Sequence, residues 1–138
     1  MFNVYCDGGA RGNPGPAAAA FVVKDASGQV IHRQGTYLGI ATNNQAEYQA
    51  VIESLKWLST MNYELTTVNY YLDSQLVVNQ LMGRFKIKDQ TLKIKYLEIM
   101  KLIASHKLTI AGFAYIPRAQ NSIADFQVNL TLDQKSSV

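Results

Sequence analysis

Phe2-Asn-Val-Tyr-Cys-Asp-Gly-Gly-Ala-Arg-Gly-Asn-Pro-Gly15 is the stretch on which the interpretation of the whole chain depends. Its first residues alternate, with Phe2, Val4 and Cys6 in the apolar phase, which predicts a short strand. The glycines and the proline that follow Asp7 disfavour a helix and predict a sharp turn. We therefore expect Asp7 to end a strand at the carboxyl edge of a sheet, where open α/β sheets hold ligands. The alternative is that Asp7 only initiates the turn, as Asp often does.

The composition is that of one globular domain. The 138 residues are 48% hydrophobic and 17% charged, so we expect a single domain over residues 1–138. No apolar run approaches the roughly 20 residues that span a bilayer, and the N-terminus lacks a signal-peptide pattern, so we expect no membrane association and a cytoplasmic protein. Cys6 is the only cysteine, which excludes an internal disulfide and a cysteine-based zinc site. Its apolar phase predicts a core residue.

The periodicity predicts an alternation of strands and helices. Three strands joined by a glycine turn and an Asp25–Gly28 hairpin precede a helix, and two further strands alternate with helices. The connector at 62–65 follows the first helix, and the tail from about 133 is expected to fray. The expected strands are 2–7, 17–24, 30–38, 67–72 and 108–116, and the expected helices are 42–58, 74–82, 92–105 and 122–130.

A second carboxylate, Glu47, lies where a helix should face the sheet. Thr42-Asn-Asn-Gln45 fits a capping box that starts this helix. Glu47 leads its apolar stripe, which continues through Ala50, Val51, Ser54, Leu55 and Leu58. A buried ionised carboxylate is costly unless it is paired or binds a metal. No Lys or Arg lies three or four positions from Glu47, so a metal is the more economical explanation.

Two more carboxylates are expected near the same edge of the sheet. Asp73 follows the strand 67–72, and a right-handed crossover would place that strand parallel to the first, with Asp7 and Asp73 side by side. Asp125 lies on the inward face of the last helix. Each has a structural alternative, since Asp73 could cap the next helix and Ser122-Ile-Ala-Asp125 fits a capping box.

The convergence of four acids predicts divalent cations. Like charges this close repel and raise one another's pKa, which a fold tolerates when cations lie between them. Oxygen ligands select hard ions, so we expect two Mg²⁺ ions, for which Mn²⁺ can substitute. Two such ions about 4 Å apart form a phosphoryl-transfer site. The chemistry expected is therefore metal-assisted hydrolysis of a phosphodiester.

The positive charge is concentrated in one segment. Residues 84–107 carry a net charge of +5, which leaves −2 for the rest of a chain whose total is +3. A basic segment on a mildly acidic body suggests a polyanionic partner. The alternative is a solvated helix face whose lysines provide solubility.

Four motifs in order resemble those of type 1 ribonuclease H, in the archaeal and bacterial form that lacks the basic protrusion. The resemblance covers essentially the whole chain. It rests on Asp7-Gly-Gly-Ala-Arg-Gly-Asn-Pro-Gly15, Thr42-Asn-Asn-Gln-Ala-Glu-Tyr48, Asp73-Ser-Gln-Leu-Val77 and Ile116-Pro-Arg-Ala-Gln-Asn-Ser-Ile-Ala-Asp125 followed by Asn129.

The resemblance implies an α/β ribonuclease H-like fold, with a five-stranded mixed sheet of order 3-2-1-4-5 flanked by helices on both faces. It implies an endonuclease that hydrolyses the RNA strand of RNA–DNA hybrids and leaves 5′-phosphate and 3′-hydroxyl ends. We expect a monomer, and double-stranded RNA stays open as a second substrate. The metal ligands and catalytic residues implied are Asp7, Glu47, Asp73 and Asp125. The substrate-binding residues expected are Asn13, Thr42, Asn43, Asn44, Gln75, Lys86, Lys88 and Arg118.

The chain departs from the family pattern at one catalytic position. Many members carry a histidine in the loop before the fourth acid, whereas this loop reads Arg118-Ala-Gln-Asn121. We expect water or Arg118 to take over the role of that histidine. Two rival functions stay open: a nucleic-acid-binding module of the same fold without activity, and a nucleotide binder that uses the glycines. The second lacks the G-x-G-x-x-G spacing and a following helix.

Overall fold

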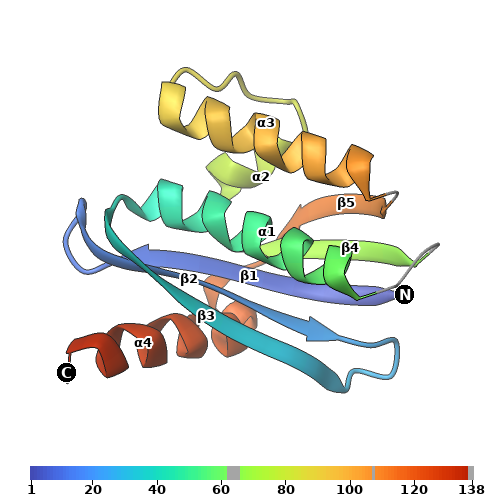
Figure 1. Ribbon diagram of the computed structural model, residues 1–138, viewed down its shortest axis with the longest axis horizontal. Helices are drawn as coiled ribbons and strands as arrows, with labels where there is room; N and C mark the ends of the chain where they lie inside the picture. The colour runs from blue at the N-terminus through green and yellow to red at the C-terminus, as the bar shows by residue number, and fades with distance from the viewer. Residues whose placement is uncertain (62–65, 107, 137–138) are drawn as a thin grey trace.

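The sheet has the predicted strand order. The computed structural model describes residues 1–61, 66–106 and 108–136. Its five strands form one mixed sheet of order β3-β2-β1-β4-β5, in which β1 pairs antiparallel with β2 and parallel with β4 (Figure 1). The strands are β1 Phe2–Ala10, β2 Gly15–Lys24, β3 Val30–Ala41, β4 Thr67–Leu72 and β5 Thr109–Tyr115.

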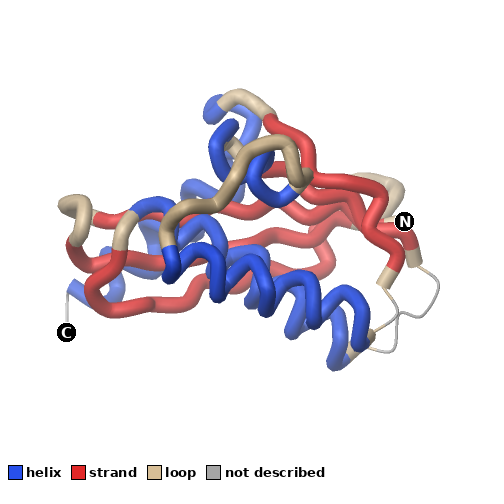
Figure 2. Tube along the Cα trace, turned by 90° about the horizontal axis from the view of Figure 1, so that it is seen from above, coloured by secondary structure: helices blue, strands red, loops and turns tan. Residues whose placement is uncertain are grey.

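Helices cover both faces of the sheet. α1, α2 and α3 lie on one face and α4 on the other, as Figure 1 shows. β1 begins at one end of the molecule and α4 finishes at the opposite end in both views (Figures 1 and 2). The helices are α1 Asn43–Thr60, α2 Gln75–Leu81, α3 Gln90–Ser105 and α4 Ser122–Ser136, and a 3-10 turn, η1 Arg118–Asn121, leads into α4.

Helix α1 forms as the sequence predicts. Thr42 accepts from Gln45 N at 3.1 Å and Gln45 Oε1 accepts from Thr42 N at 3.0 Å, so the capping box satisfies two end amides. All six residues of the predicted stripe are buried. They pack against the central strands, where Val4, Cys6 and Tyr70 are fully buried.

Three predicted boundaries were wrong by three residues or more, and two of them are strand ends. β1 continues past Asp7 through Gly8 and Gly9, which pair with Ala19 and Ala18 of β2. The small residues on both strands allow the pairing to persist where a turn was expected, and the turn falls at residues 11–14. β3 likewise extends to Ala41 rather than residue 38.

The third boundary is that of the tail. α4 continues to Ser136 instead of fraying from about 133, and Asp133 is held by an ion pair to Arg11 at 2.6 Å. The expected connector at 62–65 and Lys107 of the basic segment lie outside the described residues. Within the described part of the chain, no helix is long and apolar enough to cross a bilayer.

Candidate active site

The register of two central strands brings Asp7 and Asp73 together. In the parallel pair β1 and β4, Asn3 is opposite Asn69 and Tyr5 is opposite Tyr71. The two tyrosine rings stack with centroids 5.1 Å apart. Because side chains alternate along a strand, the next pair on the same face is Asp7 and Asp73. The predicted juxtaposition of these carboxylates therefore follows from strand pairing.

Glu47 reaches the same point from α1. Gly8 makes this approach possible, because a Cβ on it would lie 2.2 Å from the Ala46 carbonyl carbon. Oxygen atoms of Asp7, Glu47 and Asp73 all lie within 4.8 Å of one another. The three residues thus form one carboxylate cluster.

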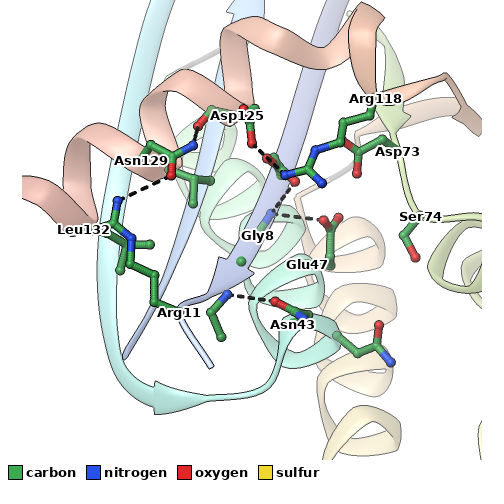
Figure 3. Close-up of a pocket in the computed structure, with 15 residues that line it drawn as sticks. Gly8, Arg11, Asn43, Glu47, Asp73, Ser74, Arg118, Asp125, Asn129 and Leu132 are labelled. Atoms are coloured by element: carbon green, nitrogen blue, oxygen red, sulfur yellow. Dashed lines mark hydrogen bonds and ion pairs between the residues drawn. The ribbon is translucent and has the colours of Figure 1, made fainter. Parts of the chain in front are cut away.

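Backbone hydrogen bonds orient the cluster. Gly8 N donates to Asp7 Oδ1 at 2.9 Å and to Glu47 Oε1 at 3.2 Å (Figure 3). Glu47 Oε2 is buried and has no hydrogen-bond partner among the described residues. A buried carboxylate oxygen without a donor is a costly arrangement for the protein alone. This donor set, three hard oxygens and an unsatisfied buried atom, fits a divalent cation.

The cluster is electrostatically strained in the protein alone. Burial raises the pKa of Asp7 to about 7, and the negative charges of Asp73 and Asp125 act in the same direction. Burial and the neighbouring Asp7 raise the pKa of Glu47 well above its usual value. Burial also raises the pKa of Asp73, and the Asn121 amide and the Arg118 charge oppose this rise. Such perturbed carboxyls in a cavity are typical of functional sites.

Asp73 is free for the cluster because another residue caps α2. The N-cap of α2 is Ser74, whose hydroxyl accepts from Val77 N at 3.2 Å. The alternative interpretation of Asp73 as a helix cap is therefore wrong. Asn121, fully buried, donates its amide to Asp73 Oδ2 at 3.3 Å and to the Cys6 carbonyl at 2.8 Å.

Asp125 lies at the edge of the cluster. It sits in the first turn of α4 and lines the same cavity, but it is not one of the three mutually close carboxylates. Its Oδ1 pairs with Arg118 Nη2 at 3.6 Å, and the Arg118 side chain is 82% exposed. Figure 3 shows the Arg118 guanidinium between Asp125 and Asp73. Arg118 therefore places a positive charge at the mouth of the acidic site.

A cavity of about 420 Å³ surrounds the four acids. It extends from Ser74 and Arg118 on one side to α4 and the first turn on the other (Figure 3). Its lining includes residues expected at the site and a further set that the sequence analysis did not name as catalytic, metal or substrate-binding residues: Gly8, Gly9, Ala10, Arg11, Ser74, Val128, Asn129 and Leu132.

The start of α1 forms another wall of the cavity. Asn43 and Asn44 line it. Asn43 Oδ1 accepts from Ala10 N at 2.8 Å, and Asn13 Oδ1 accepts from Asn43 N at 3.0 Å. Both amide oxygens are thus engaged within the protein, which leaves the amide N–H groups of Asn13 and Asn43 as the donors available to a ligand. Thr42 is the N-cap of this helix.

Five expected substrate-binding residues do not line the cavity: Asn13, Thr42, Gln75, Lys86 and Lys88. Gln75 is the exposed first residue of α2, and Lys86 and Lys88 belong to the connection between α2 and α3, where Lys86 is exposed. Because all five lie outside the lining of the cavity that holds the acids, their roles depend on a ligand larger than the cavity.

Sequence reasoning missed Asn121 and Arg11 as site residues. The sequence indicated Asn121 only as the last residue of the loop before the fourth acid, although its position four residues before Asp125 is a usable signal. It indicated Arg11 only as part of a turn. The Arg11 side chain lines the cavity and contacts Asn129 and Asp133 of α4.

Comparisons with known proteins agree with this geometry. The family model described as reverse transcriptase-like matches residues 5–131. Ribonuclease HI of Halobacterium salinarum is 36% identical over 131 residues, which are 95% of this chain and 64% of that protein. A bifunctional protein of Mycobacterium tuberculosis is 35% identical over 94% of this chain and 35% of its own length. The chain thus spans between about one third and two thirds of these curated relatives.

Two solved structures match over nearly their full length. The crystal structure of LC11-RNase H1 in complex with an RNA/DNA hybrid superposes with a TM-score of 0.93 at 37% identity, covering 98% of this chain and 99% of that one. RNase H1 of the archaeon Halobacterium salinarum gives 0.88 at 35% identity, covering 96% and 98%. With the family model, the strand order and the motifs in agreement, the chain belongs to the reverse transcriptase-like family and, within it, to the type 1 ribonucleases H.

Proposed function

We propose that the chain is an endonuclease that hydrolyses the RNA strand of RNA–DNA hybrids and leaves 5′-phosphate and 3′-hydroxyl ends. The observation that carries the proposal is the cluster of Asp7, Glu47 and Asp73 within 4.8 Å, with a buried Glu47 oxygen that lacks a partner among the described residues. The similar LC11-RNase H1, crystallised with an RNA/DNA hybrid, supports this choice of substrate.

Asp7, Glu47, Asp73 and Asp125 are the proposed ligands of two Mg²⁺ ions, with Mn²⁺ as a substitute. When bound, such ions supply a nucleophile at neutral pH and stabilise the leaving oxygen. The protein's own part is to hold the carboxylates in position. Gly8 N fixes Asp7 and Glu47, and Asn121 fixes Asp73.

The first turn of α1 is proposed to recognise the minor groove. Asn13 and Asn43 use their amide oxygens internally, so they present N–H donors. The minor groove offers acceptors on base edges and, on the RNA strand, 2′-hydroxyl oxygens. Asn44 and Gln75 are proposed to add donors of the same kind.

Charged and hydroxyl groups are proposed to bind the backbone. Thr42 would hold a phosphate of the DNA strand. Lys86 and Lys88, on the connection before α3, would contact phosphates outside the cavity. Arg118 is proposed to stand in for the missing loop histidine. It lies beside Asp125, and its positive charge opposes the rise that burial causes in the pKa of Asp73.

The test is digestion of matched, end-labelled duplexes. RNA–DNA, RNA–RNA and DNA–DNA duplexes of one sequence are incubated with Mg²⁺, Mn²⁺ or chelator. We expect cleavage of the RNA strand of the hybrid in either metal and none in chelator. Glu47→Gln removes one metal ligand and is expected to abolish cleavage. Hybrid binding without cleavage by the wild-type protein in both metals would favour the inactive binding module instead.

Four further expectations stay proposals. The chain is proposed to act as a single-domain monomer in the cytoplasm, which sedimentation equilibrium and cell fractionation would test. Double-stranded RNA as a second substrate is decided by the RNA–RNA arm of the digestion.

A further inference from the structure

Arg11 is held in a fixed position by the glycine turn. Its N–H donates to the Pro16 carbonyl at 2.8 Å across the start of β2. Gly15 packs so closely that a Cβ on it would lie 2.2 Å from the Arg11 carbonyl oxygen. Gly12 has φ +89°, which glycine adopts without strain. The glycines of this turn therefore fix the backbone from which the Arg11 side chain projects.

The Arg11 side chain is anchored on α4 through one nitrogen. Nη2 donates to Asp133 Oδ1 at 2.6 Å and to Asn129 Oδ1 at 3.4 Å. A guanidinium has five N–H donors. The described contacts use Nη2 alone, so the three donors on Nη1 and Nε are left for a ligand. The side chain lines the same cavity as the four acids and is 43% exposed.

Stability does not account for this arrangement. Asp133 is 66% exposed, and exposed ion pairs contribute roughly 0–1 kcal/mol. A planar, pre-oriented guanidinium on a cavity wall is instead suited to bidentate recognition of phosphate. The ion pair to Asp133 then serves to orient the arginine.

The spacing along α4 places Arg11 a few nucleotides from the acids. Asp125, Asn129 and Asp133 are successive positions four apart on one side of the helix, and a helix rises about 1.5 Å per residue. The two contacts of Arg11 therefore lie roughly 6 and 12 Å along the axis from Asp125. Arg118 contacts Asp125 at the other side of the cavity (Figure 3). One strand carries a phosphate about every 3.4 Å of duplex axis, so for a duplex that runs along α4 this separation corresponds to about two to three nucleotides.

We propose that Arg11 binds a backbone phosphate of the cleaved RNA strand, about two to three nucleotides from the scissile bond, on the side of the acid cluster opposite Arg118. This inference rests on the proposed hydrolysis of RNA–DNA hybrids. On this proposal the glycine turn presents Arg11, and the arginine side chain binds the phosphate. The turn is not itself a phosphate-binding loop, because it leads into a strand and not into a helix.

The first test is the salt dependence of cleavage. Arg11→Gln is expected to raise KM roughly three- to tenfold at low salt and to reduce the slope of log(kcat/KM) against log[salt] by about 1, with kcat retained. Asp133→Asn is the matched control, because it breaks the ion pair but keeps the guanidinium. If Arg11 only ties the turn to α4, Asp133→Asn will raise KM as much as Arg11→Gln. On our proposal Asp133→Asn keeps the phosphate-binding charge, so its slope of log(kcat/KM) against log[salt] stays that of the wild type.

The second test locates the contact. Single neutral methylphosphonate linkages are placed at successive positions of the RNA strand beside the scissile bond. The wild type is expected to lose affinity with the linkage at one position about two to three nucleotides away, and Arg11→Gln is expected to be insensitive at that position alone. Equal sensitivity of both proteins at every position would overturn the proposal. A wild type that leaves the unmodified hybrid intact would overturn the proposed function instead, which keeps the two failures distinct.

Discussion

Asn121 donates its buried side-chain amide to Oδ2 of Asp73, at 3.3 Å. The same amide nitrogen donates to the Cys6 carbonyl of the neighbouring strand at 2.8 Å. One side chain from the turn before α4 thus ties together the ends of β1 and β4, from which Asp7 and Asp73 project. Asn121 Oδ1 has no hydrogen-bond partner in the described part of the chain. Such an arrangement orients a proposed metal ligand at some cost in stability.

We predict that Asn121→Ala weakens metal binding and slows cleavage. The substitution leaves the buried Cys6 carbonyl without this donor and costs about 1–3 kcal/mol of unfolding free energy. It also releases Asp73, for which a loss of roughly 10- to 100-fold in metal affinity or activity is typical. Urea unfolding and calorimetric titration with Mn²⁺ measure the two effects. Asn121→Asp, nearly isosteric but without the amide donor, should be at least as defective; wild-type Mn²⁺ affinity in both variants would contradict an orienting role.

Gly8 is predicted to be intolerant of any side chain. Its missing Cβ lets α1 lie against β1, with the Ala46 carbonyl carbon 2.2 Å from where a Cβ would be. Gly8→Ala must displace backbone and is expected to destabilise the protein by about 3 kcal/mol, while moving Glu47 away from Asp7. Thermal stability and Mn²⁺ affinity should fall together.

Gly9→Ala is the matched control for this prediction. Its Cβ would meet Val128 Cγ1 at 3.7 Å, an ordinary van der Waals distance. We expect Gly9→Ala to be near neutral in both measurements. Equal destabilisation of the two variants would show that strand conformation, and not the approach of α1, sets the requirement for glycine.

Much of the fold was predictable because local signals agreed with the global arrangement. The capping box at Thr42 and the stripe that follows it define α1, and the β-branched run 67–72 coincides with β4. The parallel pairing of β1 and β4 followed from the handedness of crossovers. Together they were enough to predict that Asp7 and Asp73 lie side by side.

The errors have physical causes that a local pattern does not contain. Glycines usually break strands, which predicts an end of β1 at Asp7, yet pairing with the alanines of β2 carries the strand on to Ala10. Asp133 resembles the start of a polar tail, yet Arg11 from the opposite end of the sequence pairs with it and α4 continues. The positions of Arg11 and Asn121 depend on partners more than a hundred residues away in the sequence, which no local window includes.

Arg118 is predicted to support turnover through its charge. Its guanidinium pairs with Asp125 and lowers the pKa of Asp73 against the effect of burial. We expect Arg118→Ala to lower kcat roughly 10- to 100-fold, with a smaller change in KM, because it removes a partner of a proposed metal ligand. Steady-state kinetics on an RNA–DNA hybrid measure this. Arg118→Lys keeps the charge and should recover part of kcat, whereas unchanged turnover in Arg118→Ala would remove the role assigned to this side chain.

The lysines before α3 are predicted to contribute to hybrid binding and not to the chemical step. Lys86 and Lys88 lie outside the cavity, so neutralising both as Gln should leave kcat unchanged. Removing one phosphate-binding charge reduces the salt slope of binding by about 0.9, so the slope of the double variant should fall by about 2. Lys101→Gln on the exposed face of α3 is the control. An equal reduction of the salt slope per removed charge in this variant would indicate a general charge effect.

Asp7→Asn is predicted to abolish cleavage and to stabilise the protein in chelator. In the folded protein, burial raises the pKa of Asp7 from 3.8 to about 7. A carboxyl with a raised folded pKa favours the native state below about pH 4, and that contribution is lost as pH rises through about 7. Above about pH 7 the ionised Asp7 therefore disfavours the folded state, by on the order of 4 kcal/mol. Asn keeps an acceptor for Gly8 N and carries no charge. The variant should therefore be more stable than the wild type at about pH 8 and equally stable at about pH 4.

Urea unfolding of wild type and variant from about pH 4 to about pH 8, in chelator, tests this dependence. With saturating Mn²⁺ the wild type should be the more stable protein at the alkaline end, since it gains binding free energy that the variant lacks. Asp25→Asn serves as a control of opposite sign: the Ser27 hydroxyl lowers the pKa of Asp25 in the folded hairpin, so its contribution is present at neutral pH and lost in acid. If Asp7→Asn is less stable than wild type at the alkaline end in chelator, then Asp7 is a structural residue of the β1 strand, and the case for a cation among these carboxylates fails with it.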